Sequence, residues 1–115
     1  RNALESLPDL RPLRSLRELD VRQNRVFAMP VLPHSSTLDR VMIGFNAIAS
    51  IPADAFVGCP AVTVLDLSEN RLQELPASVA ALGGLTTLDL ANNDLADLPH
   101  ELGYLASLRH LALSG

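Results

Sequence analysis

Residues 62–72 read VTVLDLSENRL, and this stretch decides the fold. Apolar residues at 62, 65 and 67 precede Asn70, and Leu72 follows it. The alternation of apolar and polar residues in this stretch predicts a short strand with one buried face. Outward from it, asparagine recurs at intervals of 22, 22, 24 and 23 residues, at Asn2, Asn24, Asn46, Asn70 and Asn93. The sequence is therefore periodic, and its unit is one short strand plus the segment that leads to the next strand.

Every unit carries the same landmarks around its asparagine. An apolar residue stands two positions after the asparagine, and a proline stands six positions after it. Proline ends strand geometry because it cannot donate to a ladder. A further copy of the strand pattern lies near the end of the chain, at Leu108, Leu111 and Leu113. One unit cannot bury its apolar side alone, so the units are expected to stack with their strands in parallel.

The pattern resembles the L-x-x-L-x-L-x-x-N-x-L unit of the leucine-rich repeat family, and the resemblance covers the whole chain. It implies an α/β solenoid, with a curved parallel β-sheet on the concave face and short 3-10 or helical returns on the convex face. We expect residues 1–115 to form one segment of about five repeats, each 22–24 residues long. The chain starts and stops inside a repeat and shows no cap at either end, so we expect a piece of a longer protein.

The segments that follow the prolines, called returns below, differ along the chain. Residues 75–85 and 98–105 resemble the L-P-x-S-x-x-x-L returns of intracellular Ras-group and plant-type repeats. Their apolar period of three to four residues predicts a short helix. Residues 51–56 instead have the I-P-x-x-A-F form that is common in extracellular repeats. Residues 9–12 and 31–36 contain further prolines and are expected to be extended.

The asparagine column is interpreted as structural. Where each strand ends, the chain turns and leaves backbone N–H and C=O groups unpaired, and a carboxamide can both donate to and accept from such groups. Each group left unpaired in the interior would cost about 1–3 kcal/mol. We expect a ladder between coils, with no ligand role, from Asn24, Asn46, Asn70 and Asn93.

Composition and charge exclude several classes of partner. The chain has 115 residues, of which 48% are apolar and 3% aromatic, and its net charge is −4. Residues 1–25 hold six of the nine arginines and four acidic residues, which leaves three arginines and nine acidic residues for the remainder. An acidic body without a basic stripe argues against a nucleic-acid partner, and no apolar run is long enough to span a membrane. The single cysteine and the absence of an Asn-x-Ser/Thr acceptor favour a reducing, cytoplasmic setting.

No set of side chains predicts an active site. The residues that most often carry chemistry are His34, His100, His110 and Cys59. The histidines belong to two returns and one strand, so they cannot converge on one metal ion, and the cysteine is expected to fill the core as a small hydrophobe. Residues 34–36 near Asp39 contain histidine and serine, but neighbours on an extended return cannot point at one another as a catalytic relay requires. We therefore expect no enzyme activity, no cofactor and no metal.

The outward-facing strand positions predict a surface for a protein partner. Met42 and Phe45 place large apolar side chains on a face that should meet water, and such residues are enriched in interface cores. Asp66 and Asp89 occupy one position in successive repeats, so their carboxylates are expected about 5 Å apart, where they would attract a basic partner. The predicted partner-binding residues are Met42, Phe45, Asp66, Glu69, Asp89, Arg22 and Arg40.

Two alternatives stay open at this level. The aspartates are also the commonest filling of this position in repeats of the family, and Phe45 could fold over the strand edge against Gln23 or Glu69. The predicted function is a non-catalytic protein-interaction scaffold whose partner carries a basic patch. The alternative function is the substrate-recognition region of a larger enzyme, a ubiquitin ligase or a kinase, whose catalytic domain lies outside this segment.

Overall fold

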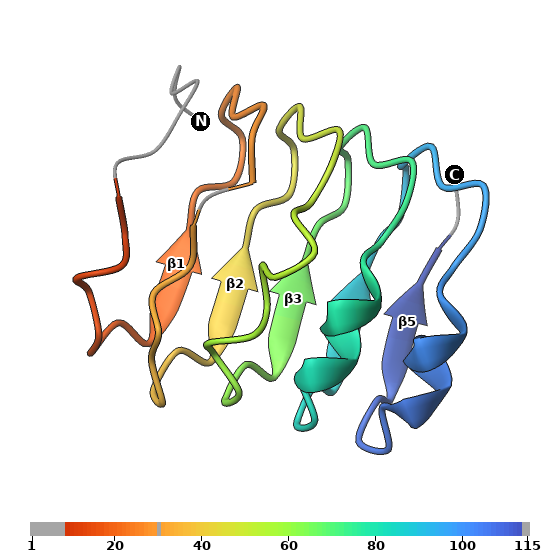
Figure 1. The fold of residues 1–115 in the computed structure, drawn as a ribbon. Coiled ribbons are helices and arrows are strands. Elements are labelled where there is room, and N and C mark those ends of the chain that lie inside the picture. The colour runs from red at the N-terminus through yellow and green to blue at the C-terminus, as the bar shows by residue number, and fades with distance from the viewer. Residues whose placement is uncertain (1–8, 30, 114–115) are drawn as a thin grey trace.

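The computed structural model describes residues 9–29 and 31–113, which form a stack of five coils. Each coil contributes one short strand, and the strands pair in parallel in chain order (Figure 1). The strands are β1 (Glu18–Asp20), β2 (Arg40–Met42), β3 (Val64–Asp66), β4 (Thr87–Asp89) and β5 (His110–Ala112). The repeat landmarks Asn2, Leu4, Pro8 and Pro30 lie outside the described residues. The α/β solenoid expected from the sequence is confirmed.

Corresponding positions of successive repeats stand side by side in the sheet. The central residue of each strand pairs with the central residue of the next, from Leu19 in β1 to Leu111 in β5. The central residues of the first four strands are buried, whereas Leu111 is 42% exposed. Within the described residues β5 pairs only with β4, so its far edge has no covering coil. The alternation in the sequence therefore predicts the buried face of β1–β4 and fails at β5.

The returns of the fourth and fifth coils are helical. Two 3-10 helices, η1 (Ala77–Ala81) and η2 (His100–Tyr104), each begin after an extended proline. A proline there supplies a preset φ and withholds an N–H that the helix does not need. In Figure 1, η1 lies in front of β4 and the two helices stand next to each other. The sequence prediction of short helical returns at 75–85 and 98–105 is confirmed.

The earlier returns contain turns and extended chain, with one correction. The segment at 9–12, expected to be extended, forms a turn in which the N–H of Leu13 donates to the carbonyl oxygen of Leu10 at 2.9 Å. The fixed φ of Pro12 suits a turn as well as an extended chain, so proline alone could not separate the two. Of residues 31–36, expected to be extended, residues 31–35 carry neither helix nor turn and residue 36 begins a bend.

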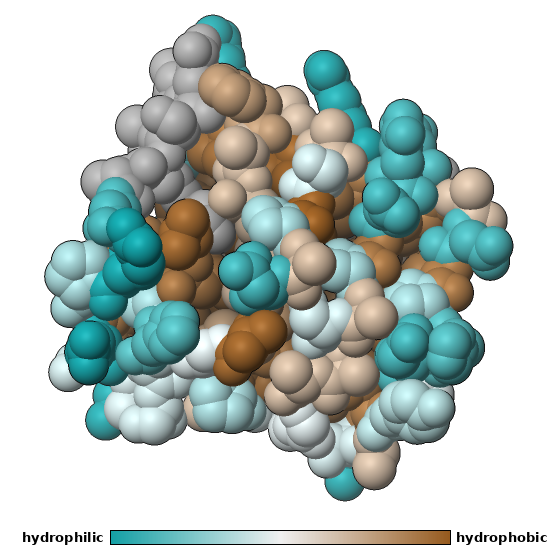
Figure 2. All heavy atoms as spheres, in the orientation of Figure 1, coloured by the Kyte–Doolittle hydropathy of each residue, from teal (hydrophilic) through white to brown (hydrophobic). Residues whose placement is uncertain are grey.

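Figure 2 shows the face of the molecule that carries the returns, where apolar and polar side chains alternate in patches. Val31 and Val57 are the large apolar residues of the second and third returns that stay most exposed, at 59% and 61%. Val31 lines a hollow of about 100 Å³ together with His34 and Gly58. Among the described residues, no helix is long and apolar enough to cross a membrane.

The core lies between the sheet and the returns and is filled almost entirely by aliphatic side chains. Leu38, Ile43, Leu65 and Leu88 are fully buried, and Phe56 is the one aromatic in the described core. Cys59 is fully buried among them, and burial raises the pKa of its thiol. It is therefore an inert filler of the core, as the sequence predicts.

The asparagine side chains join neighbouring coils. Asn46, Asn70 and Asn93 each donate from Nδ2 to a carbonyl oxygen of the preceding coil and to one of their own coil, at 2.9 to 3.1 Å. Each also accepts at Oδ1 a hydrogen bond from a backbone N–H of the preceding coil, at 2.9 to 3.0 Å. Asn24 donates to the carbonyl oxygen of Val21 in its own coil. One carboxamide in each of the first four coils thus satisfies backbone groups that the turn leaves without a partner.

A second set of bonds, which the sequence did not reveal, ties the coils together where the strands begin. The carbonyl oxygen of Thr63 accepts from the N–H groups of both Thr86 and Thr87 in the next coil, at 2.8 and 3.1 Å. The hydroxyl of Thr86 donates to the same oxygen at 3.1 Å. The hydroxyl of Thr63 bonds in turn to the carboxylate of Asp39 in the coil before. Thr63 and Thr86 therefore each add a side-chain hydrogen bond to the preceding coil.

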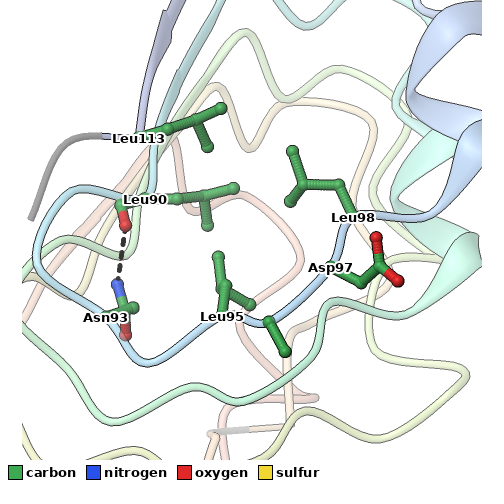
Figure 3. A pocket seen from close by; sticks show the side chains of 7 residues that line it. Leu90, Asn93, Leu95, Asp97, Leu98 and Leu113 are labelled. Atoms are coloured by element: carbon green, nitrogen blue, oxygen red, sulfur yellow. Dashed lines mark hydrogen bonds between the residues drawn. The ribbon is translucent and has the colours of Figure 1, made fainter.

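The core of the last coil forms a hollow of about 440 Å³ (Figure 3). The side chains of Leu90, Leu95, Leu98 and Leu113 point towards it. Its polar neighbours are Asp97 and Asn93, and the Nδ2 of Asn93 already donates to the carbonyl oxygen of Leu90 at 3.1 Å. Apolar side chains and an amide that is already hydrogen-bonded supply no catalytic group. We therefore interpret this hollow as the open end of the apolar core.

Candidate functional site

The outward residues of the strands form the concave face on which the sequence places the partner site. Met42 pairs with Asp20 on one side and with Asp66 on the other, so an apolar side chain stands between two carboxylates. Asp66 pairs in turn with Asp89 across β3 and β4. Strands are spaced by about 4.8 Å, so the two carboxylates are close neighbours. The order of residues across this face is thus the one read from the sequence columns.

One column of this face has an unusual backbone. The residue before each ladder asparagine has a positive φ: Gln23 at 62°, Phe45 at 60°, Glu69 at 55° and Asn92 at 60°. This left-handed conformation costs a residue with a side chain about 1–2 kcal/mol, and Asn is the residue other than glycine that tolerates it best. All four coils share the turn, so the conformation belongs to the repeat. The second coil differs from the other three in having an aromatic residue, Phe45, at this position.

Phe45 and four polar neighbours surround a hollow of about 350 Å³ on the concave face. Its walls are Asp20, Arg22, Gln23, Phe45 and Asp66, which come from the first three coils. The ring of Phe45 stands beside Gln23 at the hollow and is still 51% exposed. The side chain of Phe45 is therefore accessible for contact with another molecule.

Asp20 and Arg22 form the strongest ion pair of the hollow. Nε and Nη2 of Arg22 donate to the two carboxylate oxygens of Asp20 at 2.9 and 2.7 Å. These hydrogen bonds lower the pKa of Asp20 below its ordinary value and raise the pKa of Arg22. Both side chains are more than one third exposed, so the pair contributes little to stability. Its two-bond geometry nevertheless holds the guanidinium in place over the face.

The aspartates at the strand ends also have a local role. Oδ1 of Asp66 accepts from the N–H and the hydroxyl of Ser68, at 3.0 and 2.7 Å. Oδ1 of Asp89 accepts from the N–H of Ala91 at 3.1 Å. Each carboxylate therefore caps the first turn after its strand, which favours a structural reason for aspartate in this position. The same bonds leave the second oxygen of each group for other contacts.

The structure separates the predicted partner residues into groups. Arg22, Phe45 and Asp66 meet at the hollow. Asp89 instead lines a shallow depression with Thr87, Arg109, His110 and Ala112. Glu69 accepts a hydrogen bond from the side chain of Asn92. Arg40 lies at the start of β2, between Glu18 and Val64.

Sequence reasoning missed two residues of the hollow and one neighbour of its wall. Asp20 and Gln23 belong to the outward columns but carry no pattern that singles them out. Gly44 is the neighbour, because a Cβ at this position would lie 3.0 to 3.2 Å from Ser68 and the carboxylate of Asp66. Its column holds Arg22, Ser68 and Ala91 in the other described coils, so a missing side chain beside Phe45 was the available signal.

A stack of short parallel strands with an asparagine ladder, and with polar groups and one aromatic on its open face, defines a solenoid repeat protein. The family model described as "Leucine rich repeat" matches residues 36–95. The chain belongs to the leucine-rich repeat family.

Relatives of known identity extend this conclusion. The chain is 35% identical over 86 residues to leucine-rich repeat-containing G-protein coupled receptor 5 of Rattus norvegicus, which covers 73% of the chain and 9% of the receptor. It is 34% identical over 62 residues to osteomodulin of Mus musculus, over 54% of the chain and 14% of osteomodulin. The chain thus spans a small part of these relatives.

A solved structure shows the same fold. The crystal structure of the BIR3–SERK2 complex from Arabidopsis thaliana superposes with a TM-score of 0.60 at 30% identity, over 70% of this chain and 44% of that chain. The order of the last repeats also resembles leucine-rich repeat-containing protein 40, and that closer resemblance stays a prediction.

Proposed function

We propose that this segment is a non-catalytic interaction module that binds a protein partner on the concave face of β1–β3. The observation that carries the proposal is Phe45, a half-exposed ring in a column that is otherwise polar. Burying such a ring against a partner removes apolar area from water and accounts for much of the binding energy of typical interfaces. The neighbouring hollow gives a partner side chain a place to enter.

The charges around Phe45 support a partner with a basic patch. Asp66 and Glu69 lie on the same face, and Asp89 stands beside Asp66 in the next strand. Their negative potential would steer a basic surface towards the sheet and act mainly on the rate of association. Met42, half-buried between Asp20 and Asp66, adds apolar contact area in the middle of this group.

The comparisons support a binding role of this general kind. Leucine-rich repeats typically serve as protein-interaction modules, and stacked repeats create extended concave binding surfaces. The similar solved structure is, by its title, a complex between two proteins. These likenesses favour protein binding for the present chain without identifying the partner.

The proposal can be tested with two matched double variants. Met42→Ser with Phe45→Ser removes the apolar residues of the concave face, and Val31→Ser with Val57→Ser removes an equal number from the return face. Proteins captured by the wild-type chain should be retained by the return-face variant and lost by the concave variant. Loss from the return-face variant alone, or equal loss from both, would place the site elsewhere.

Once a partner is in hand, two smaller changes separate apolar from electrostatic contributions. Phe45→Ala should weaken binding by about 2 kcal/mol, the usual scale of a hot spot. Asp66→Asn combined with Asp89→Asn should reduce the dependence of the association rate on salt. Calorimetry and stopped-flow mixing at two ionic strengths measure these effects, with Glu101→Ala on η2 as the return-face control.

We also propose that the protein works in a reducing, cytoplasmic setting. The chain has a single cysteine, and Cys59 is buried with its thiol pKa raised, so it is not available for disulfide exchange. Microscopy of the full-length protein carrying a fluorescent tag tests the location. Retention in the secretory pathway would contradict the proposal.

A further inference from the structure

The hollow on the concave face carries an unbalanced charge. Its walls contain two carboxylates, on Asp20 and Asp66, and one guanidinium, on Arg22. Asp20 is neutralised by its two-bond pair with Arg22. Within the described residues, Oδ2 of Asp66 accepts no hydrogen bond, since Ser68 donates only to Oδ1. Asp66 therefore makes no ion pair within the described residues, and Arg22 acts on its charge by Coulombic attraction without a direct contact.

Gly44 lets the carboxylate of Asp66 pack closely against the coil that presents Phe45. A Cβ at position 44 would lie 3.1 Å from Oδ2 of Asp66 and 3.0 Å from the hydroxyl oxygen of Ser68. Gly44 does not have a positive φ, so the backbone there does not require glycine. The missing side chain instead allows Asp66 and Ser68 to lie where they do, with Asp66 at the wall of the hollow.

Phe45 contributes an aromatic wall to the same space. Its N–H donates to the carbonyl oxygen of Ser68 at 2.9 Å, which fixes the base of the ring next to the turn that Asp66 caps. The face of an aromatic ring attracts a cation, and a guanidinium stacks on it particularly well. The hollow thus offers a carboxylate and an aromatic ring that line one cavity.

We propose that this hollow binds one arginine side chain of the protein partner, with the guanidinium between the ring of Phe45 and Oδ2 of Asp66. The inference rests on the proposed function, because it names the chemistry of the partner at that same face. Arginine fits better than lysine because its flat group can stack on a ring and donate to a carboxylate at the same time. Arg22 shows the chemistry within the chain itself, since its guanidinium is held by Asp20 at the neighbouring wall.

The probe for this inference is a blocked pentapeptide, Gly-Ser-Arg-Ser-Gly, compared with the same peptide carrying uncharged citrulline in place of arginine. Each peptide is titrated into the full chain while the backbone amides are followed by NMR. The arginine peptide should shift the amides of Gly44, Phe45 and Ser68 and bind about tenfold more tightly than the citrulline peptide, the size expected for one charged hydrogen bond. Equal binding of the two peptides, or shifts confined to other residues, would overturn the inference.

Variants sharpen the test because they act in opposite directions. Asp66→Asn keeps an oxygen for Ser68 but removes the charge, and should weaken the arginine peptide about tenfold. Gly44→Ala should weaken it by displacing the carboxylate of Asp66, whereas Arg22→Gln should tighten it about threefold because Asp20 becomes a second free carboxylate. Glu101→Gln on η2, outside the hollow, should change the affinity less than about twofold.

The outcome is separable from that of the proposed function. The paired serine variants report whether any protein binds the concave face, whatever its chemistry. If partner binding needs Met42 and Phe45 but the arginine and citrulline peptides bind alike, the proposed function stands and the arginine assignment is wrong. Tightening by Arg22→Gln cannot come from unfolding, so it supports the assignment independently of the variants that lose binding.

Discussion

Asn70 reaches across the coil boundary to Ile43: its Nδ2 donates to the carbonyl oxygen of Ile43 at 3.1 Å, 27 positions earlier in the chain. Asn70 is buried, and its Oδ1 also accepts from the N–H of Ile48 at 3.0 Å. Replacing Asn70 by alanine removes both links and leaves backbone groups unpaired in the interior. The free energy of unfolding should fall by about 1–3 kcal/mol, as measured by urea titration.

Gln73→Ala is the matched control for this change, because Gln73 is an exposed amide side chain a few positions later. It should leave the urea midpoint within about 0.5 kcal/mol of the wild type. An Asn70→Ala midpoint equal to that of the control would mean that water replaces the ladder bonds.

Ser78 offers a change in the opposite direction. Its hydroxyl oxygen is buried in η1 and makes no hydrogen bond within the described residues. Alanine removes an unsatisfied polar group and is the better helix former, so Ser78→Ala should stabilise the chain by about 1 kcal/mol. Thermal unfolding checks this, with the exposed Ser107→Ala as control. A lower melting temperature for Ser78→Ala would show that the hydroxyl has a partner in solution.

Phe45 allows stability and binding to be separated. Its φ of 60° is unfavourable for a bulky residue and tolerable for asparagine. Phe45→Asn should therefore raise the melting temperature slightly or leave it unchanged, while partner binding falls. Phe45→Val, with a branched side chain at the same φ, should lower both. If Phe45→Asn destabilises the chain as much as Phe45→Val does, the ring serves packing rather than recognition.

The Asp20–Arg22 pair predicts a dependence of stability on pH. Because hydrogen bonds from Arg22 hold the pKa of Asp20 below its ordinary value of about 3.9, the pair stabilises the folded state at pH values above that value. The contribution is lost as the pH falls through the lowered pKa and the carboxylate is protonated. The difference in unfolding free energy between wild type and Asp20→Asn should therefore shrink from pH 7 to pH 2.5.

Asp97→Asn is the control for the pH experiment, since Asp97 is exposed and makes no hydrogen bond or ion pair within the described residues. A carboxyl NMR titration gives the same information directly. In the Arg22→Ala variant the pKa of Asp20 should return towards its ordinary range, and an unchanged pKa would contradict the pair.

The open edge of β5 predicts self-association of residues 1–115 when this segment is produced alone. Leu111 and Leu113 are 42% and 46% exposed next to a strand edge without a partner in the described part of the chain. Such edges template pairing with another chain. Sedimentation velocity should show concentration-dependent association or aggregation. Leu111→Lys should suppress it and the turn variant Ala106→Lys should not; a segment that stays monomeric throughout would contradict the prediction.

The fold was predictable because aligning the asparagines of two successive repeats is enough to set the register between their strands. Once Asn46 and Asn70 are aligned, Val41 must stand beside Leu65, and the structure places them so. The missing caps predict the apolar edge that Leu111 exposes, whereas the turn at 9–12 was not predictable because proline suits a turn and an extended chain alike. The local sequence pattern predicts the structure of a coil in the middle of the stack better than that of a coil at either end.

The candidate site was only partly predictable. The sequence places Phe45 and Asp66 on one face, but a pattern of letters cannot show that the backbone at Phe45 is left-handed or that Asp66 uses one oxygen to hold Ser68. The role of Gly44 depends on a distance between atoms of two coils, which only coordinates provide. The chemistry of a binding site depends on distances between atoms, whereas the repeat fold depends on the spacing of residues along the sequence.

The change from turn-like returns to the helices η1 and η2 has a mechanical consequence for the sheet. Neighbouring strands are separated by about 4.8 Å, whereas packed helices need roughly 8–10 Å between their axes. Where the returns need a wider spacing than the strands, neighbouring coils are rotated relative to each other and the sheet curves. Because both helices pack together there, we expect the sheet to bend more across β4 and β5 than across β1–β3. The hollow beside Phe45 belongs to the first three coils, so a partner lying along the sheet would meet a flatter surface there than beyond it.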